Sequence, residues 1–139
     1  MAVFNKFQDF VEQLGLGKHN LDTDVLKIML SNTAVLNTNT IKANITEIAA
    51  GNGYTAGGTD AAGVYSETPA GTGSLTCTDV VWTAAAGTFG PFRYVVLYND
   101  TTAAPVKPLI GWWDYGSSIT LADTETFTAD FGATTLTIT

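Results

Sequence analysis

The residue types that most often carry chemistry are few and scattered in this chain. It has one histidine, His19, and one cysteine, Cys77, and its thirteen carboxylates stand singly rather than in a recognisable motif. A metal site needs several convergent His, Cys or carboxylate ligands, and a reactive thiol usually has a basic partner. Asp22 and Asp24 alternate along an expected extended segment, where they could bind a cation weakly or begin a strand in solvent. The sequence therefore predicts no enzyme, no cofactor and no metal site.

A glycine-dense stretch at residues 51–58 invites comparison with a phosphate-binding loop. Such a loop usually ends in Lys followed by Ser or Thr and opens a helix, but Thr59 and Asp60 follow here. We therefore predict a turn-rich loop with Tyr54 anchored in the core. Cys77 is expected to be a small buried hydrophobe, and His19 a loop or capping residue.

The elements that must position these residues are mostly strands. Short aromatic and β-branched runs separated by turn residues predict successive strands. They cover residues 80–83, 92–100, 108–116, 125–131 and 136–139. Residues 25–30 predict a further strand, whereas residues 41–48 could form a strand or contain a helical turn. The expected fold is all-β, an antiparallel β-sandwich of the jelly-roll or immunoglobulin-like type with a short N-terminal amphipathic helix.

The N-terminal segment has the apolar period of a helix. The apolar residues that recur at intervals of three and four are Val3, Phe4, Phe7, Phe10, Val11 and Leu14. They predict a helix over residues 3–14 that ends before Gly15 and Gly17. The helix and its linker are assigned to residues 1–18 and the β-sandwich domain to residues 19–139. Because the helix could cover its own core or dock on a neighbour, Phe4, Phe7 and Phe10 are candidate interface residues.

Adjacent tryptophans mark the expected strand at residues 108–116. On a strand, Trp112 and Trp113 must face opposite sides, so one should enter the core. The other should lie beneath the N-terminal helix or on an open face. An open tryptophan beside Tyr115 could stack on a sugar or seat a partner subunit. Trp112, Trp113 and Tyr115 are therefore added to the candidate interface.

The composition narrows the classes of partner. The 139 residues fit one domain, and only 14% of them are charged, against about 25% in an average protein. Burying a surface with so few charges costs little desolvation free energy, which favours assembly. Many threonine-rich extracellular β-proteins, however, share this composition. The net charge of −7 argues against direct nucleic-acid binding. We see no apolar run approaching the ~20 residues that span a bilayer and no secretory signal.

Several segments together resemble small virion structural proteins of tailed bacteriophages. They include residues 24–30, the pair 47–48 with the glycine-rich stretch 51–58, and the runs 80–82, 98–100 and 108–116. Phe127 and residues 136–137 complete the likeness, which covers most of the chain. The resemblance implies a β-sandwich used as an assembly module, and a capsid decoration (cement) protein fits best within that class.

The resemblance also implies partners and a location. The partners would be the major capsid protein or other virion proteins together with further copies of this chain, with a trimer favoured. The protein would be made in the host cytoplasm and reside on the outer capsid surface of the virion. One alternative is a tail, baseplate or head-fibre component. A second, from another class, is a carbohydrate-binding β-sandwich module.

Overall fold

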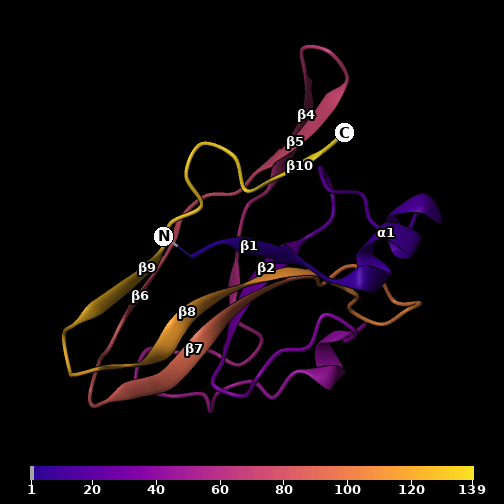
Figure 1. The fold of residues 1–139 in the computed structure, drawn as a ribbon. Helices are drawn as coiled ribbons and strands as arrows, with labels where there is room; N and C mark the ends of the chain where they lie inside the picture. Colours follow the sequence, from indigo (N-terminus) through magenta and orange to yellow (C-terminus); the bar gives the residue numbers. More distant parts are fainter. Residues whose placement is uncertain (1) are drawn as a thin grey trace.

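Antiparallel strands are the main regular elements of the computed structural model, which describes residues 2–139 (Figure 1). A five-stranded sheet has the order β1-β8-β7-β2-β3, a three-stranded sheet the order β10-β5-β4, and β6 pairs with β9. The bounds are β1 Phe4–Lys6, α1 Gln8–Gly15, β2 Leu26–Ser31, the 3-10 turn η1 Lys42–Asn44, β3 Thr59–Asp60, β4 Val64–Thr68, β5 Thr72–Thr76, β6 Val80–Thr83, β7 Phe89–Asn99, β8 Leu109–Leu121, β9 Thr126–Ala129 and β10 Leu136–Ile138. The predicted all-β, sandwich-like fold with a short N-terminal helix is confirmed.

The strands predicted in the second half of the chain are all present as β6 to β10. The main difference is length, because β7 and β8 form one long hairpin whose ladder continues past Gly116 to Leu121. Shifts in register between Phe89 and Tyr94 mark bulges in this hairpin. Of residues 41–48, which the sequence left open between strand and helical turn, Lys42–Asn44 form η1.

The central strands are buried on both faces. Leu26, Ile28 and Leu30 of β2 point into the larger core cluster, as the alternation of the strand predicts. Met29 points the other way, into a second cluster that contains Val96 of β7. Because both faces of β2 and β7 are covered, these strands read as nearly continuous apolar runs.

The N-terminal segment differs from the predicted helix over residues 3–14. Residues 4–6 form β1, which pairs with β8 in the register Phe4↔Trp113 and Lys6↔Gly111, and α1 begins only at Gln8. Phe7 lies between the two elements with an extended backbone. The prediction of a single helix was wrong because residues 4–6 form hydrogen bonds with the open edge of β8. A local apolar period cannot reveal such a distant partner. The boundary drawn at residue 18 also crosses the core, since Phe10 packs within the larger cluster.

The close approach of β1 to β8 depends on Gly111. A Cβ added at this residue would lie 2.1 Å from the Phe4 ring and 2.7 Å from the Asn5 carbonyl oxygen. A side chain there would displace β1, so the glycine before the two tryptophans is what admits the extra strand.

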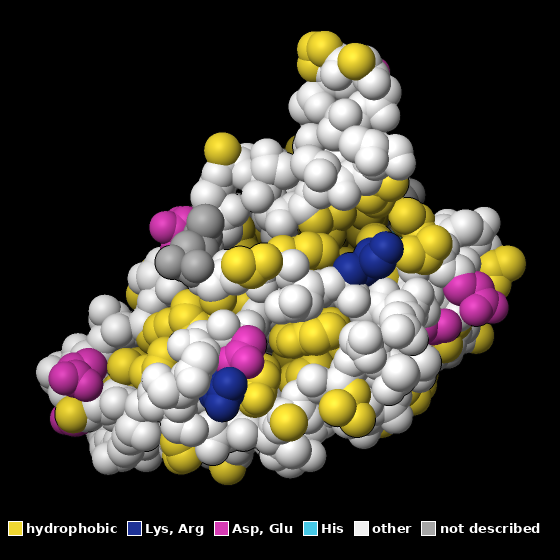
Figure 2. Space-filling view, in the orientation of Figure 1, with side chains coloured by type: hydrophobic (Ala, Val, Ile, Leu, Met, Phe, Trp, Pro, Cys, Tyr) yellow, Lys and Arg dark blue, Asp and Glu magenta, His cyan; other side chains and the backbone are white. Residues whose placement is uncertain are grey.

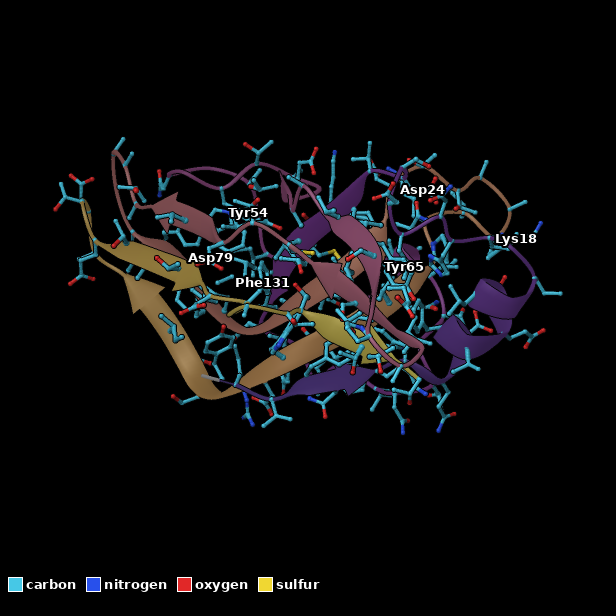
Figure 3. All side chains as sticks on the ribbon, turned by 90° about the horizontal axis from the view of Figure 1, so that it is seen from above. Lys18, Asp24, Tyr54, Tyr65, Asp79 and Phe131 are labelled. Atoms are coloured by element: carbon cyan, nitrogen blue, oxygen red, sulfur yellow. The ribbon has the colours of Figure 1, made fainter. Side chains whose placement is uncertain are left out.

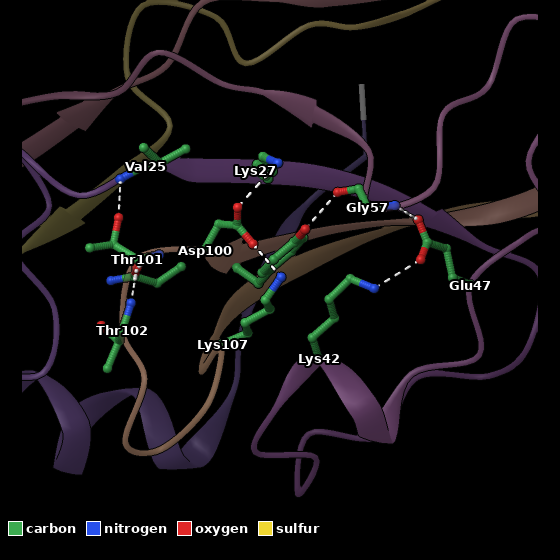
Figure 4. Close-up of polar contacts among 11 residues, drawn as sticks. Val25, Lys27, Lys42, Glu47, Gly57, Asp100, Thr101, Thr102 and Lys107 are labelled. Atoms are coloured by element: carbon green, nitrogen blue, oxygen red, sulfur yellow. Dashed lines mark hydrogen bonds and ion pairs between the residues drawn. The ribbon is translucent and has the colours of Figure 1, made fainter.

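Polar contacts fix the long irregular segment between β2 and β3 (Figure 4). The Glu47 carboxylate accepts hydrogen bonds from the Tyr54 hydroxyl (2.7 Å) and the Gly57 amide, and it pairs with Lys42 at 2.9 Å. Partial burial opposes ionisation, but the hydrogen bonds from Tyr54 and Lys42 prevail and lower the pKa of Glu47. Tyr54 is 3% exposed, which confirms its predicted role as an anchor.

A second polar centre joins the loop after β7 to β2. Asp100 pairs with Lys107 at 2.8 Å and with Lys27 at 3.1 Å. The neighbouring Thr101 hydroxyl accepts a hydrogen bond from the Val25 amide (Figure 4). Ion pairs thus tie the turn that follows β7 to the sheet.

The division of residues 3–14 into strand and helix predicts unequal effects of substitution. Phe7→Ala should lower the free energy of unfolding by about 3–5 kcal/mol, because Phe7 is 0% exposed. Val11→Ala should change it by less than about 0.5 kcal/mol, because Val11 is 54% exposed. Urea denaturation of both variants measures the two values. Equal losses would instead support a continuous helix that buries both residues.

Candidate docking surface

The β4–β5 hairpin extends away from the rest of the molecule as an arm, residues 64–76 (Figure 1). β10 pairs with β5 from Leu75, opposite Leu136, as far as Gly73, opposite Ile138, and residues 68–72 extend beyond it. The tip, residues 67–71, is exposed. A two-stranded ribbon is at best marginally stable alone in water, so the end of the arm beyond Gly73 is short of stabilising contacts.

A groove lies at the foot of the arm, between α1, β1 and β10. It has a volume of about 310 Å³. Its lining is mostly apolar and consists of Phe4, Lys6, Phe10, Val11, Leu14, Leu136, Thr137, Ile138 and Thr139. Figure 2 shows hydrophobic side chains gathered at the surface where the arm meets the body. The groove can bury apolar groups of another molecule.

Two unpaired strand edges border the groove. In the sheets of residues 2–139, β1 pairs only with β8 and β10 only with β5. The outer edge of each strand therefore offers backbone donors and acceptors to another chain. Such edges bind extended segments by adding a strand.

Lys6 gives the groove one positive charge. Of the six basic residues, four form ion pairs, whereas Lys6 and Lys18 have no carboxylate within 4.0 Å in the part of the chain that the structure describes. Lys18 does not line the groove, but Lys6 does. A carboxylate brought in by a partner would complement this charge.

The three predicted phenylalanines have different environments. Phe7 and Phe10 are 0% and 2% exposed and belong to the two core clusters, so they offer a partner almost no surface, although Phe10 borders the groove. Phe4 is half-buried, lines the groove and packs edge-on against Trp113, with 5.3 Å between ring centroids. Of the three, only Phe4 contributes to the groove with an appreciably exposed side chain.

The predicted aromatic pair faces opposite sides of β8, as expected. Trp113 is 5% exposed in the larger core, whereas Trp112 packs against the second cluster with its ring 4.6 Å from that of Phe7. The outer tryptophan is thus partly covered by the residue just before α1. Tyr115 is half-buried against Phe127. The three residues do not form one surface.

His19 lies in a loop, as predicted, but it is buried. Figure 3 shows Asp24 and Tyr65 near the end of the molecule that carries α1, and His19 and Tyr65 line a shallow cavity there. The Asn99 side-chain oxygen accepts hydrogen bonds from the amides of Thr101 and Thr102. Its amide nitrogen therefore donates to Asp24 (2.6 Å) and to His19 Nδ1 (3.2 Å). This arrangement places the imidazole proton on Nε2.

The two aspartates near His19 stabilise loops instead of alternating along a strand. Asp24 accepts a hydrogen bond from the Asn20 amide, and Asp22 accepts one from the Tyr65 amide at the base of the arm. No group of three or more potential metal ligands occurs among residues 2–139. Cys77 is buried as predicted, and burial raises the pKa of its thiol. No helix within the described residues is long and apolar enough to cross a membrane.

The buried neutral imidazole predicts acid sensitivity. Burial lowers the pKa of His19 to about 4, although Asp24 and Asp9 oppose the shift. The unfolded chain therefore binds this proton near pH 6.5 and the folded chain only near pH 4, so stability falls as the pH drops through that window. The loss should reach at most about 3 kcal/mol.

Urea denaturation between pH 7 and pH 4 measures this loss. His19→Gln removes the titration but keeps an acceptor for Asn99, so its stability should fall less steeply with acid. Parallel curves for the two proteins would show that His19 does not titrate in this way.

Comparison with known proteins gives no further assignment. No protein-family model, no curated protein and no solved structure matches the chain. The surface features above are therefore what bears on function: a protruding arm, and at its foot an apolar groove with two open strand edges and one unpaired lysine.

Proposed function

We propose that this protein is a structural component of a tailed-phage virion, a head decoration protein that binds the outer capsid surface and stabilises the shell. The observation that carries the proposal is the apolar groove at the foot of the arm. A groove between open strand edges is suited to burying another polypeptide. The resemblance of the strand and turn segments to phage virion proteins supports the same class.

The mechanism of such a protein is burial of surface, without chemistry. Charged residues make up only 14% of the chain, so apolar and uncharged polar surface can be buried without desolvating many charges. About 1,600 Å² of interface is enough for specific attachment. Copies that assemble with each other, as a trimer or another oligomer, and then bind the major capsid protein would gain further affinity through avidity.

Two other functions are a tail, baseplate or head-fibre component and a carbohydrate-binding module. A tail, baseplate or head-fibre component would use the same groove and arm, so location in the particle separates it from a decoration protein. A carbohydrate module needs an open aromatic platform, but Trp113 is buried and Trp112 lies against Phe7. No second function is therefore proposed.

A reconstitution experiment tests the proposal. Purified protein is added to capsids of the encoding phage that lack it, and binding and shell rupture temperature are measured. We expect saturable binding and a higher rupture temperature, since a ligand at one hundred times its Kd stabilises its target by about 2.7 kcal/mol per site. An unrelated β-sandwich protein of similar net charge is the control.

Electron microscopy of the same particles gives the location. Label over the head surface is the expected result. Label on tails alone, with unchanged shell stability, would contradict the decoration role.

A further inference from the structure

The tip of the arm combines apolar groups with one negative charge. Pro69 and Ala70 are exposed, and Figure 2 shows hydrophobic side chains at the end of the arm. The Glu67 carboxylate accepts a hydrogen bond from the Gly71 amide, which holds it at the turn. Ala70 has φ 72°, a left-handed conformation that normally favours glycine. A methyl group is thus displayed at the tip despite its backbone cost.

The groove has the complementary character. Its walls are apolar, with Val11 54% exposed, and Lys6 supplies the unpaired positive charge. The turn at the tip projects beyond the end of β10, away from the body and the groove (Figure 1). The arm therefore cannot fill the groove of its own chain, and a second copy can supply the tip instead.

We propose that the arm tip of one copy docks in the groove of a second copy, with Pro69 and Ala70 against Val11 and the Glu67 carboxylate at Lys6. This inference rests on the proposed function, because it names the surface through which copies assemble before they bind a shell. The contact would cover the exposed end of the arm and shield one apolar groove for each copy. It joins two different surfaces, so it is either exchanged reciprocally between two copies or repeated head to tail, in a ring where the rotation closes and in a filament where it does not.

Charge reversal tests the contact. Sedimentation velocity over a concentration series measures self-association of the wild type, Lys6→Glu, Glu67→Lys and the double variant. Each single reversal should weaken association about tenfold, because it replaces an attraction between close charges by a repulsion, and the double variant should restore it. Lys18→Glu and Asp123→Lys reverse exposed charges elsewhere and should leave association unchanged.

Crosslinking tests the same contact independently of affinity. Lys6→Cys protein mixed with Glu67→Cys protein should form a disulfide-linked pair, whereas neither variant alone should do so through these residues. The native Cys77 is buried, and wild-type protein treated in the same way measures any crosslinking through it. Val11→Asp should abolish association, and Val81→Asp, at an equally exposed valine on β6, should not. Thermal denaturation checks that each variant is folded.

The outcomes separate this inference from the proposed function. A wild type that stays monomeric, a double variant that is not restored, or no crosslinked pair would overturn docking of the arm in the groove. Capsid binding by a monomer would leave the decoration role intact. Association as described without capsid binding would instead retain the arm contact and refute the decoration role.

Discussion

The pairing of residues 4–6 with β8 is the interaction on which the rest of the structure depends. It holds Phe7 extended against Trp112 and turns the chain so that α1 delivers Phe10 to the opposite core. It also leaves Phe4 and Lys6 at the wall of the groove. A three-residue strand contributes few hydrogen bonds of its own, so its stability comes from the two aromatic side chains that follow it. Both cores and the docking surface thus share one short edge strand.

The fold class was predictable because the strand signals are local. Aromatic and β-branched runs bounded by turn residues identified all five strands from β6 to β10. The N-terminus misled because the positions of Phe4, Phe7 and Phe10 also satisfy a helical period, and a strand of three residues is too short to show alternation. Gly111 decides between strand and helix for residues 4–6. Because it has no side chain, β8 can pair with a strand more than a hundred residues away in sequence.

The candidate surface could not be predicted in the same way. Its walls come from residues 4–14 and 136–139, at opposite ends of the sequence. The tryptophan pair was assigned to opposite faces from alternation alone, but the cover over Trp112 depends on where Phe7 lies. No local signal marked Lys6 as unpaired, because Asp9 stands three residues further on, at the spacing of a helical ion pair. Burial of His19 depends on Asn99, eighty residues away, and had no local signal.

The Glu47 centre changes how the segment between β2 and β3 should be regarded. A long irregular stretch usually tolerates insertions and exchanges its amide hydrogens quickly. Here Tyr54 accepts a hydrogen bond from the amide of Leu30 and donates to Glu47, and Tyr98 donates to the carbonyl of Gly57. Side chains thus replace the missing ladder. A foreign peptide inserted near residues 47–57 would break the same bonds that hold β2, so for display or tagging this segment belongs with the core.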